Sequence, residues 1–131
     1  MISPRYHREI PQRYRLEAGK CTKCGEVHFP PRKICRKCFA ETFETVRLPR
    51  RGKVLTHTTI WIPPAAFEEQ KPYVVAVVEL AGGVRLTCMV AEAPPDEVRI
   101  GTEVEIVFRR LQSAPAWEVL QYGYKARVIP A

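Results

Sequence analysis

Four cysteines form the strongest chemical pattern in the sequence. They lie in two Cys-x-x-Cys pairs, Cys21/Cys24 and Cys35/Cys38, with ten residues between the pairs. Each pair is expected on a tight turn that directs both sulfurs to one side, and two such turns form the tetrahedral Cys₄ shell that Zn²⁺ prefers. Four thiolates leave no open coordination position, so a structural site is predicted. The alternatives are iron in a rubredoxin-like shell, a redox pair and an empty ribbon.

The other nucleophilic and titratable residues form no recognisable catalytic group. The fifth cysteine, Cys88, alternates in phase with three apolar residues of its segment, Val84, Leu86 and Val90. It is therefore expected to be a small buried hydrophobe. His28 lies near the cysteines and is an alternative metal ligand, but four cysteines already complete a shell. The sequence contains no Gly-rich phosphate loop and no Ser nucleophile elbow. A stand-alone enzyme is therefore the least supported function.

An aromatic and cationic run near the C-terminus could bind an anionic ligand. Its aromatic rings could stack on a base while its cations hold phosphates, and its members are Tyr122, Tyr124, Lys125 and Arg127. The alternative is an ordinary strand with two cations that extend into solvent. Four further cations lie in or near the cysteine turns: Lys23, Lys33, Arg36 and Lys37. They either offset the negative charge of the metal site or form an anion-binding face.

Three large apolar residues raise the question of partner contacts. Phe67 is expected to be exposed at the tip of the long loop 63–72, where it is a candidate partner contact. Its alternative is a surface loop stiffened by proline. Trp61 and Trp117 are expected to pack against the ends of the folded core rather than to contact a ligand.

Charge divides the chain into two parts. The 131 residues carry a net charge of +7, with 14 Lys/Arg and 5 Asp/Glu in residues 1–53 and 7 and 9 in residues 54–131. A basic front half suits a negatively charged partner such as nucleic acid, a phosphorylated cofactor or an acidic protein face. Segment 1–10 is polar and lacks a signal-peptide core, so reduced thiols in a cytoplasmic protein are expected. No stretch has the roughly 20 apolar residues that a membrane span needs.

The secondary structure that must position these residues is mostly β. Apolar spacing predicts one short helix over 4–12, strands over 13–17 and 43–48 around the cysteines, and a hinge at 49–52. Beyond the hinge, strands are predicted over 53–62, 73–80, 84–91, 103–109 and 117–129.

Side-chain patterns add detail to these strands. The apolar run 73–80 is typical of a strand covered on both faces, and 84–91 is expected to bury its even positions. Val104, Ile106 and Phe108 are expected inside, and Gly123 is expected to mark a β-bulge. Five strands with a break before the fourth fit a small closed barrel of OB type, which predicts a helix and Cys₄ ribbon in residues 1–52 and an OB fold in 53–131.

Several motifs, in this order, resemble a known family. They are the run Arg8–Tyr14, the first cysteine turn Cys21-Thr-Lys-Cys24-Gly25, the linker Phe29-Pro30-Pro31-Arg32, the second pair Cys35/Cys38 and the ending Tyr122-Gly123-Tyr124-Lys125. Together they are similar to the acyl-CoA-associated zinc-ribbon/OB-fold family, long catalogued as a domain of unknown function. Ala126 departs from the more usual aromatic at its position.

The resemblance implies a fold, partners and a ligand. It implies an N-terminal helical segment, a rubredoxin-like zinc ribbon and a C-terminal OB fold. The similar archaeal members are non-catalytic subunits that bridge acetoacetyl-CoA thiolase and 3-hydroxy-3-methylglutaryl-CoA (HMG-CoA) synthase in early mevalonate synthesis. They help to line a shared CoA site, which would involve the aromatic and cationic run in this chain.

Nucleic-acid binding is the main alternative function. Zinc ribbons and OB folds both occur in single-strand binders, and a basic protein suits them. Against this interpretation, the predicted barrel half is slightly acidic, and segments 73–80 and 84–91 carry Val, Ala, Thr and Met where stacking aromatics would be needed.

Overall fold

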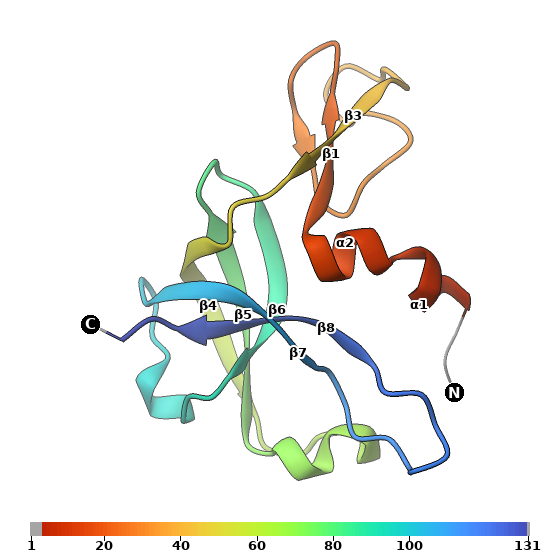
Figure 1. Cartoon of the computed structure of the whole chain (residues 1–131). Helices are drawn as coiled ribbons and strands as arrows, with labels where there is room; N and C mark the ends of the chain where they lie inside the picture. The colour runs from red at the N-terminus through yellow and green to blue at the C-terminus, as the bar shows by residue number, and fades with distance from the viewer. Residues whose placement is uncertain (1–3, 131) are drawn as a thin grey trace.

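The computed structural model describes residues 4–130, which form a small three-stranded sheet, two short helices and a closed five-stranded barrel (Figure 1). The small sheet has the order β2-β1-β3 and consists of β1 (Glu17–Cys21), β2 (Val27–His28) and β3 (Phe43–Arg47). Helices α1 (Pro4–Arg8) and α2 (Ile10–Arg15) lie at the junction between this sheet and the barrel. None of the helices within residues 4–130 is long and apolar enough to cross a membrane.

The barrel has the strand order β4-β5-β6-β8-β7 and closes through pairing of β4 with β7. Its strands are β4 (Arg51–Ile60), β5 (Tyr73–Leu80), β6 (Arg85–Ala91), β7 (Glu103–Arg110) and β8 (Tyr122–Val128). Short 3₁₀ helices occupy two connections, η1 (Ala65–Gln70) between β4 and β5 and η2 (Pro95–Glu97) between β6 and β7. A zinc ribbon followed by a five-stranded barrel is the predicted fold class, and it is confirmed.

The N-terminal segment differs from its prediction. Two short helices replace the single one predicted, and residues 13–15 are helical, so the strand predicted over 13–17 is wrong for that part. Pro11 lies in the first turn of α2, where its missing N–H costs no hydrogen bond. Tyr14 turns its ring edge toward Phe108, with the ring centroids 4.8 Å apart. This packing against the barrel favours helix over the alternation that residues 13–17 show.

One hydrophobic core joins the two parts of the molecule. Leu16, Ala18 and Leu48 from the ribbon side belong to the same buried cluster as the barrel residues, among them Val54 and Ile106. Leu48 N–H donates to the Leu16 carbonyl at 3.0 Å, and Ile106 N–H donates to the Arg50 carbonyl at 2.7 Å. The ribbon therefore folds against the barrel rather than standing apart from it.

Two expectations about the barrel strands were wrong. β5 buries only Val74, Ala76, Val78 and Leu80, because its alternate residues are only partly covered, so it is not a strand with two buried faces. Gly123 lies in an unbroken β7–β8 register, and the register shift lies between Val54 and Thr56 in β4. A Cβ on Gly123 would lie 2.9 Å from Leu111 Cδ1, so a larger residue there would require the Leu111 side chain to shift. In β6, Leu86, Cys88 and Val90 are buried as predicted.

The large apolar residues at the barrel ends are also placed differently from their predictions. Trp61 and Trp117 are 67% and 83% exposed, so neither packs the core, and Trp117 precedes β8 rather than lying within it. Phe108 is 43% exposed at the open end of β7. Phe67 is half-buried in η1 with its ring 6.0 Å from that of Tyr73, so it is not the exposed loop tip that was expected.

Candidate metal centre and ligand groove

The four ribbon cysteines meet at one point. Their sulfurs all lie within 4.8 Å of one another, and the Sγ atoms of Cys21 and Cys38, like those of Cys24 and Cys35, are 3.5 Å apart. These separations exceed a disulfide bond, so the thiols are free. Cys21 ends β1, and each cysteine pair is closed by a turn: Gly25 N–H donates to the Cys21 carbonyl and Phe39 N–H to the Cys35 carbonyl. This donor set fits a tetrahedral structural zinc ion, whose bound sulfurs would be thiolates.

Hydrogen bonds lower the pKa of two of these four thiols. His28 is buried, and its Nε2 lies 3.4 Å from Cys35 Sγ. This contact, together with backbone N–H groups that include that of Lys37, lowers the pKa of the Cys35 thiol to about 5. Backbone N–H groups also lower the pKa of Cys21. His28 lies outside the cluster of metal-ligating atoms, so its place is that of a hydrogen-bond partner to a ligand rather than an alternative ligand.

The four C-terminal candidates do not share a face. Successive side chains alternate across a strand, so Tyr122 and Tyr124 lie on one side of β8 and Lys125 and Arg127 on the other. The Tyr122 ring stacks on Phe108 at 5.1 Å, and its carbonyl accepts a hydrogen bond from the Tyr6 hydroxyl. The Tyr124 ring lies 5.8 Å from that of Phe29, and burial raises the pKa of its hydroxyl.

The two cations of β8 already have protein partners. Lys125 is buried, and its Nζ donates to Gln70 Oε1 at 2.5 Å, while Gln70 Nε2 donates to the Leu111 carbonyl at 3.0 Å. Burial lowers the pKa of Lys125. Arg127 Nη2 lies 3.1 Å from Glu105 Oε2. Lys125 thus ties η1 and the β7–β8 connection to the barrel.

A groove of about 320 Å³ lies beside Tyr124. Its walls come from α1 and α2, from Pro30 in the linker between the cysteine pairs, and from β6 and β8. Strands β6 and β8 pair only through Val90↔Ala126 and Ala91↔Arg127, which leaves space between them toward the helices. Two cations, one carboxylate and apolar surface meet there: the lining includes Arg5, Glu9, Arg13, Met89, Leu111 and Tyr124.

The sequence analysis missed the helical side of this groove. Arg5 and Arg13 both contact the carboxylate of Glu9, at 2.5 and 2.7 Å, and the guanidinium of Arg13 lies 5.2 Å from the Tyr6 ring centroid. The hydrogen bonds from Arg5 and Arg13 lower the pKa of Glu9. The spacing Arg5-Glu9-Arg13, four residues at each step, is a helical signal that could have revealed this cluster.

Cys88, also in the groove wall, has no nucleophilic character. It is buried, and desolvation raises the pKa of its thiol to about 12. A thiol that stays protonated at neutral pH is neither a nucleophile nor a metal ligand. The structure therefore supports the prediction of a small buried hydrophobe.

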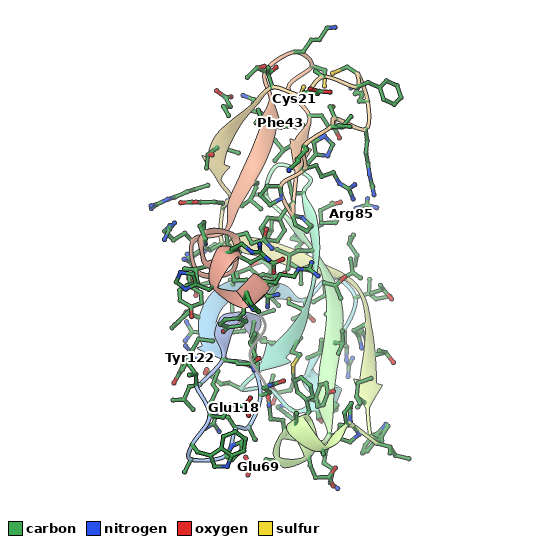
Figure 2. The ribbon with its side chains drawn as sticks, turned by 90° about the vertical axis from the view of Figure 1, so that its right-hand side faces the viewer. Cys21, Phe43, Glu69, Arg85, Glu118 and Tyr122 are labelled. Atoms are coloured by element: carbon green, nitrogen blue, oxygen red, sulfur yellow. The ribbon has the colours of Figure 1, made fainter. Side chains whose placement is uncertain are left out.

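Figure 2 shows that the metal centre and the barrel loops lie far apart, with Cys21 near one end of the molecule and Glu69 and Glu118 near the other.

Two family descriptions match successive parts of the chain. Residues 8–44 match the rubredoxin-like zinc ribbon domain of ChsH2, and residues 45–109 match its C-terminal OB-fold domain. One relative that is 43% identical over 93% of this chain is named a "DUF35 domain-containing scaffold protein". The chain belongs to the DUF35 family. Together the two matches span the cysteine cluster, the linker and four of the five barrel strands.

Relatives of this DUF35 chain have names that refer to scaffolds and acyl-CoA enzymes. The scaffold protein that is 43% identical is from Methanocaldococcus jannaschii, and the match covers 87% of its own length. The benzoylsuccinyl-CoA thiolase subunit BbsA of Thauera aromatica is 33% identical over 70% of this chain and 61% of its own. The solved structure titled "Ltp2-ChsH2(DUF35) aldolase" has a TM-score of 0.75 and 29% identity, and covers 97% of this chain and 96% of the matched chain.

Proposed function

We propose that the chain is a non-catalytic accessory subunit of an acyl-CoA enzyme complex. The observation that carries this proposal is the similarity, over about nine-tenths of the chain, to relatives named scaffold proteins. A thiolase subunit is similar in sequence to 70% of this chain, and a solved aldolase structure contains a similar fold. The Cys₄ cluster supports a structural metal, and the fifth thiol is inert, which agrees with a protein that assembles enzymes rather than one that carries out a reaction.

More specifically, we propose that the chain bridges a thiolase and HMG-CoA synthase. Condensation of two acetyl-CoA molecules to acetoacetyl-CoA is thermodynamically unfavourable, so direct delivery of the product to a favourable next step draws the reaction forward. A scaffold that keeps both enzymes in one complex raises the effective concentration of the intermediate at the second enzyme. The support for this step is the family resemblance to archaeal bridging subunits.

The groove beside Tyr124 is the proposed contact with CoA. Its cations, Arg5 and Arg13, can pair with phosphate oxygens, and the apolar residues Met89 and Leu111 can contact the pantetheine chain. Tyr124 lines this groove, so it is retained as a CoA contact. The side chains of Lys125 and Arg127 lie on the opposite face of β8 and do not line the groove. They would contact CoA only where a partner enzyme presents it to that face.

Affinity capture from the native host tests the proposal. A tagged, zinc-loaded chain is incubated with host lysate at low salt, and the proteins that co-elute are identified by mass spectrometry. Recovery of a thiolase and HMG-CoA synthase in near-equal amounts supports the bridge. Recovery of another thiolase-like enzyme retains the accessory role but changes the pathway. Recovery of nucleic acid or ribosomal proteins instead contradicts the proposal and favours single-strand binding.

A further inference from the structure

The two cysteine turns have the same backbone design but differ at one residue. In the first turn, Gly25 follows Cys24, has a φ of +76° and donates its N–H to the Cys21 carbonyl at 2.9 Å. In the second turn, Phe39 follows Cys38, has a φ of +57° and donates its N–H to the Cys35 carbonyl at 3.1 Å. Glycine adopts this left-handed conformation without steric cost, whereas a residue with a Cβ does not. The second turn therefore holds a bulky residue where glycine fits best.

The fold gains little from this phenylalanine. Phe39 is 77% exposed, and among the described residues its ring takes part in no aromatic contact. It lies outside the buried cluster and the residues packed against it. A strained backbone conformation that presents an aromatic ring to solvent indicates a function beyond folding, because strain of this kind is retained where a site needs it.

Three cations lie on the same two cysteine turns as this ring. Lys23 lies in the first turn and Arg36 and Lys37 in the second, and all three side chains are exposed. Within residues 4–130, Lys37 has a distant ion pair with Glu26 at 4.0 Å, and no ion pair involves Lys23 or Arg36.

We infer that the ribbon tip, defined as Lys23, Arg36, Lys37 and Phe39, is a docking surface for an acidic face of the partner enzyme. This inference rests on the proposed function and names the part of the chain that holds one partner. Phe39 would enter an apolar pocket at the centre of the contact, and the cations would pair with carboxylates around it, as in interfaces with an aromatic anchor and a charged rim. Figure 2 places this end of the molecule, marked by Cys21, far from the barrel loops at Glu69 and Glu118.

A protein face fits this surface better than a nucleic acid does. The carboxylate of Glu26 lies 4.0 Å from the Lys37 ammonium, where it would repel a continuous phosphate backbone. The tip also presents a single exposed aromatic ring, whereas binding of single-stranded nucleic acid depends on several stacking platforms along a groove.

Binding measurements on two tip variants test the inference. The probe is each acyl-CoA enzyme that the wild-type chain captures from host lysate, and the chains are compared as zinc-loaded full-length proteins. Phe39→Gly is expected to weaken binding of one enzyme at least about tenfold, the loss typical of an interface anchor, with full zinc content and an equal or higher melting temperature. Arg36→Glu is expected to weaken the same binding and to reduce its salt dependence.

The control and the contrary results are distinct. Arg99→Glu makes the same change of charge on the barrel, where the Arg99 side chain is exposed, and should leave this binding unchanged. Capture of every enzyme by Phe39→Gly as tightly as by the wild type overturns the inference alone, and so does an equal loss for Arg99→Glu. Loss of zinc together with binding assigns Phe39 to folding and also overturns it. If the wild type binds single-stranded DNA and Phe39→Gly does not, the partner of the ribbon tip is a nucleic acid, and the inference of an enzyme partner is overturned. If the wild type captures no acyl-CoA enzyme, the proposed function itself fails, and the inference fails with it.

Discussion

At the scale of single residues, His28 acts on the metal site through a hydrogen bond to one of its cysteine ligands, Cys35. The position of His28 in the sequence makes it an alternative metal ligand, but its Nε2 instead lies 3.4 Å from Cys35 Sγ. Its ring also packs edge-on near Phe43, with 5.9 Å between the centroids. These two contacts hold the imidazole where it can donate to the thiolate, so the effect of His28 on the metal is indirect.

Replacement of His28 should weaken zinc retention without removing a ligand. In His28→Phe the Cys35 thiolate loses a donor, its pKa rises from about 5, and protons compete with zinc at higher pH. We expect zinc affinity at pH 7 to fall roughly tenfold and the pH midpoint of zinc release to rise. A chromogenic chelator titrated across pH measures both. His28→Gln, which restores a donor, should recover part of the loss, and His57→Phe in β4 should match the wild type. An unchanged midpoint in His28→Phe would contradict this role.

Arg13 gives a test of the groove at the same scale. It lines the groove and contacts Glu9, so Arg13→Glu reverses a charge next to the proposed phosphates. We expect the affinity of the assembled enzyme complex for CoA to fall about tenfold, since a charge-assisted contact is replaced by repulsion. Equilibrium dialysis of CoA against the complex measures it. Arg85→Glu, in an exposed ion pair outside the groove, is the matched control. Equal CoA affinity in Arg13→Glu and the control would exclude the groove as the phosphate contact.

At the scale of elements, β4 and β5 approach so closely that one position requires glycine. A Cβ on Gly52 would lie 2.4 Å from the Glu79 carbonyl oxygen, a backbone atom that cannot move aside without a shift of β5. Gly52→Ala should lower the free energy of unfolding by about 1–3 kcal/mol. Gly19→Ala is the matched control in β1, where the nearest atom would be Phe43 Cδ1 at 3.5 Å, and its effect should stay within about 0.5 kcal/mol. Urea unfolding compares the two, and equal stabilities would refute the close approach.

The elements that sequence patterns predicted best are those whose side chains point to one core. β5 has the bounds predicted, because its apolar run is bounded by Pro72 and by the turn at Gly82 and Gly83. The cysteine cluster was predicted for a similar reason, since the spacing within each pair sets a local turn. Residues 13–15 of α2 were predicted as strand because a short alternating segment has the same pattern in a strand and in a helix that packs through Tyr14.

Long-range packing accounts for most of the remaining errors. Nothing local to Trp117 indicates that β8 begins only at Tyr122, nor that the Lys125 ammonium pairs with an amide 55 residues away. The groove depends on α1, α2, the linker and two strands meeting in space, so its residues share no motif along the chain. Tyr122 and Lys125 form one cluster in the sequence, yet the alternation of β8 places them on opposite faces.

At the scale of the whole molecule, zinc and the barrel should be coupled. Leu16 and Ala18, on the ribbon side, are buried in the same core as Val54 and Ile106 of the barrel. If the ribbon loses its order without metal, these two residues no longer shield that part of the barrel core from water. We expect chelation of zinc to lower the melting temperature of the chain by at least about 10 °C and to speed amide hydrogen exchange in β5. Readdition of zinc should restore both. Exchange in β5 that is unchanged after complete zinc removal would show that the ribbon and the barrel are energetically independent.

In the bridging function that we propose, this chain holds a thiolase and HMG-CoA synthase together. The most direct test of this function is size-exclusion chromatography of the purified host thiolase and HMG-CoA synthase, mixed with and without the zinc-loaded chain. We expect the two enzymes to elute separately on their own. When the chain is added, we expect them to elute together in one larger species that contains it. Separate elution of the two enzymes in the presence of the chain, or their co-elution without it, would contradict the bridging function.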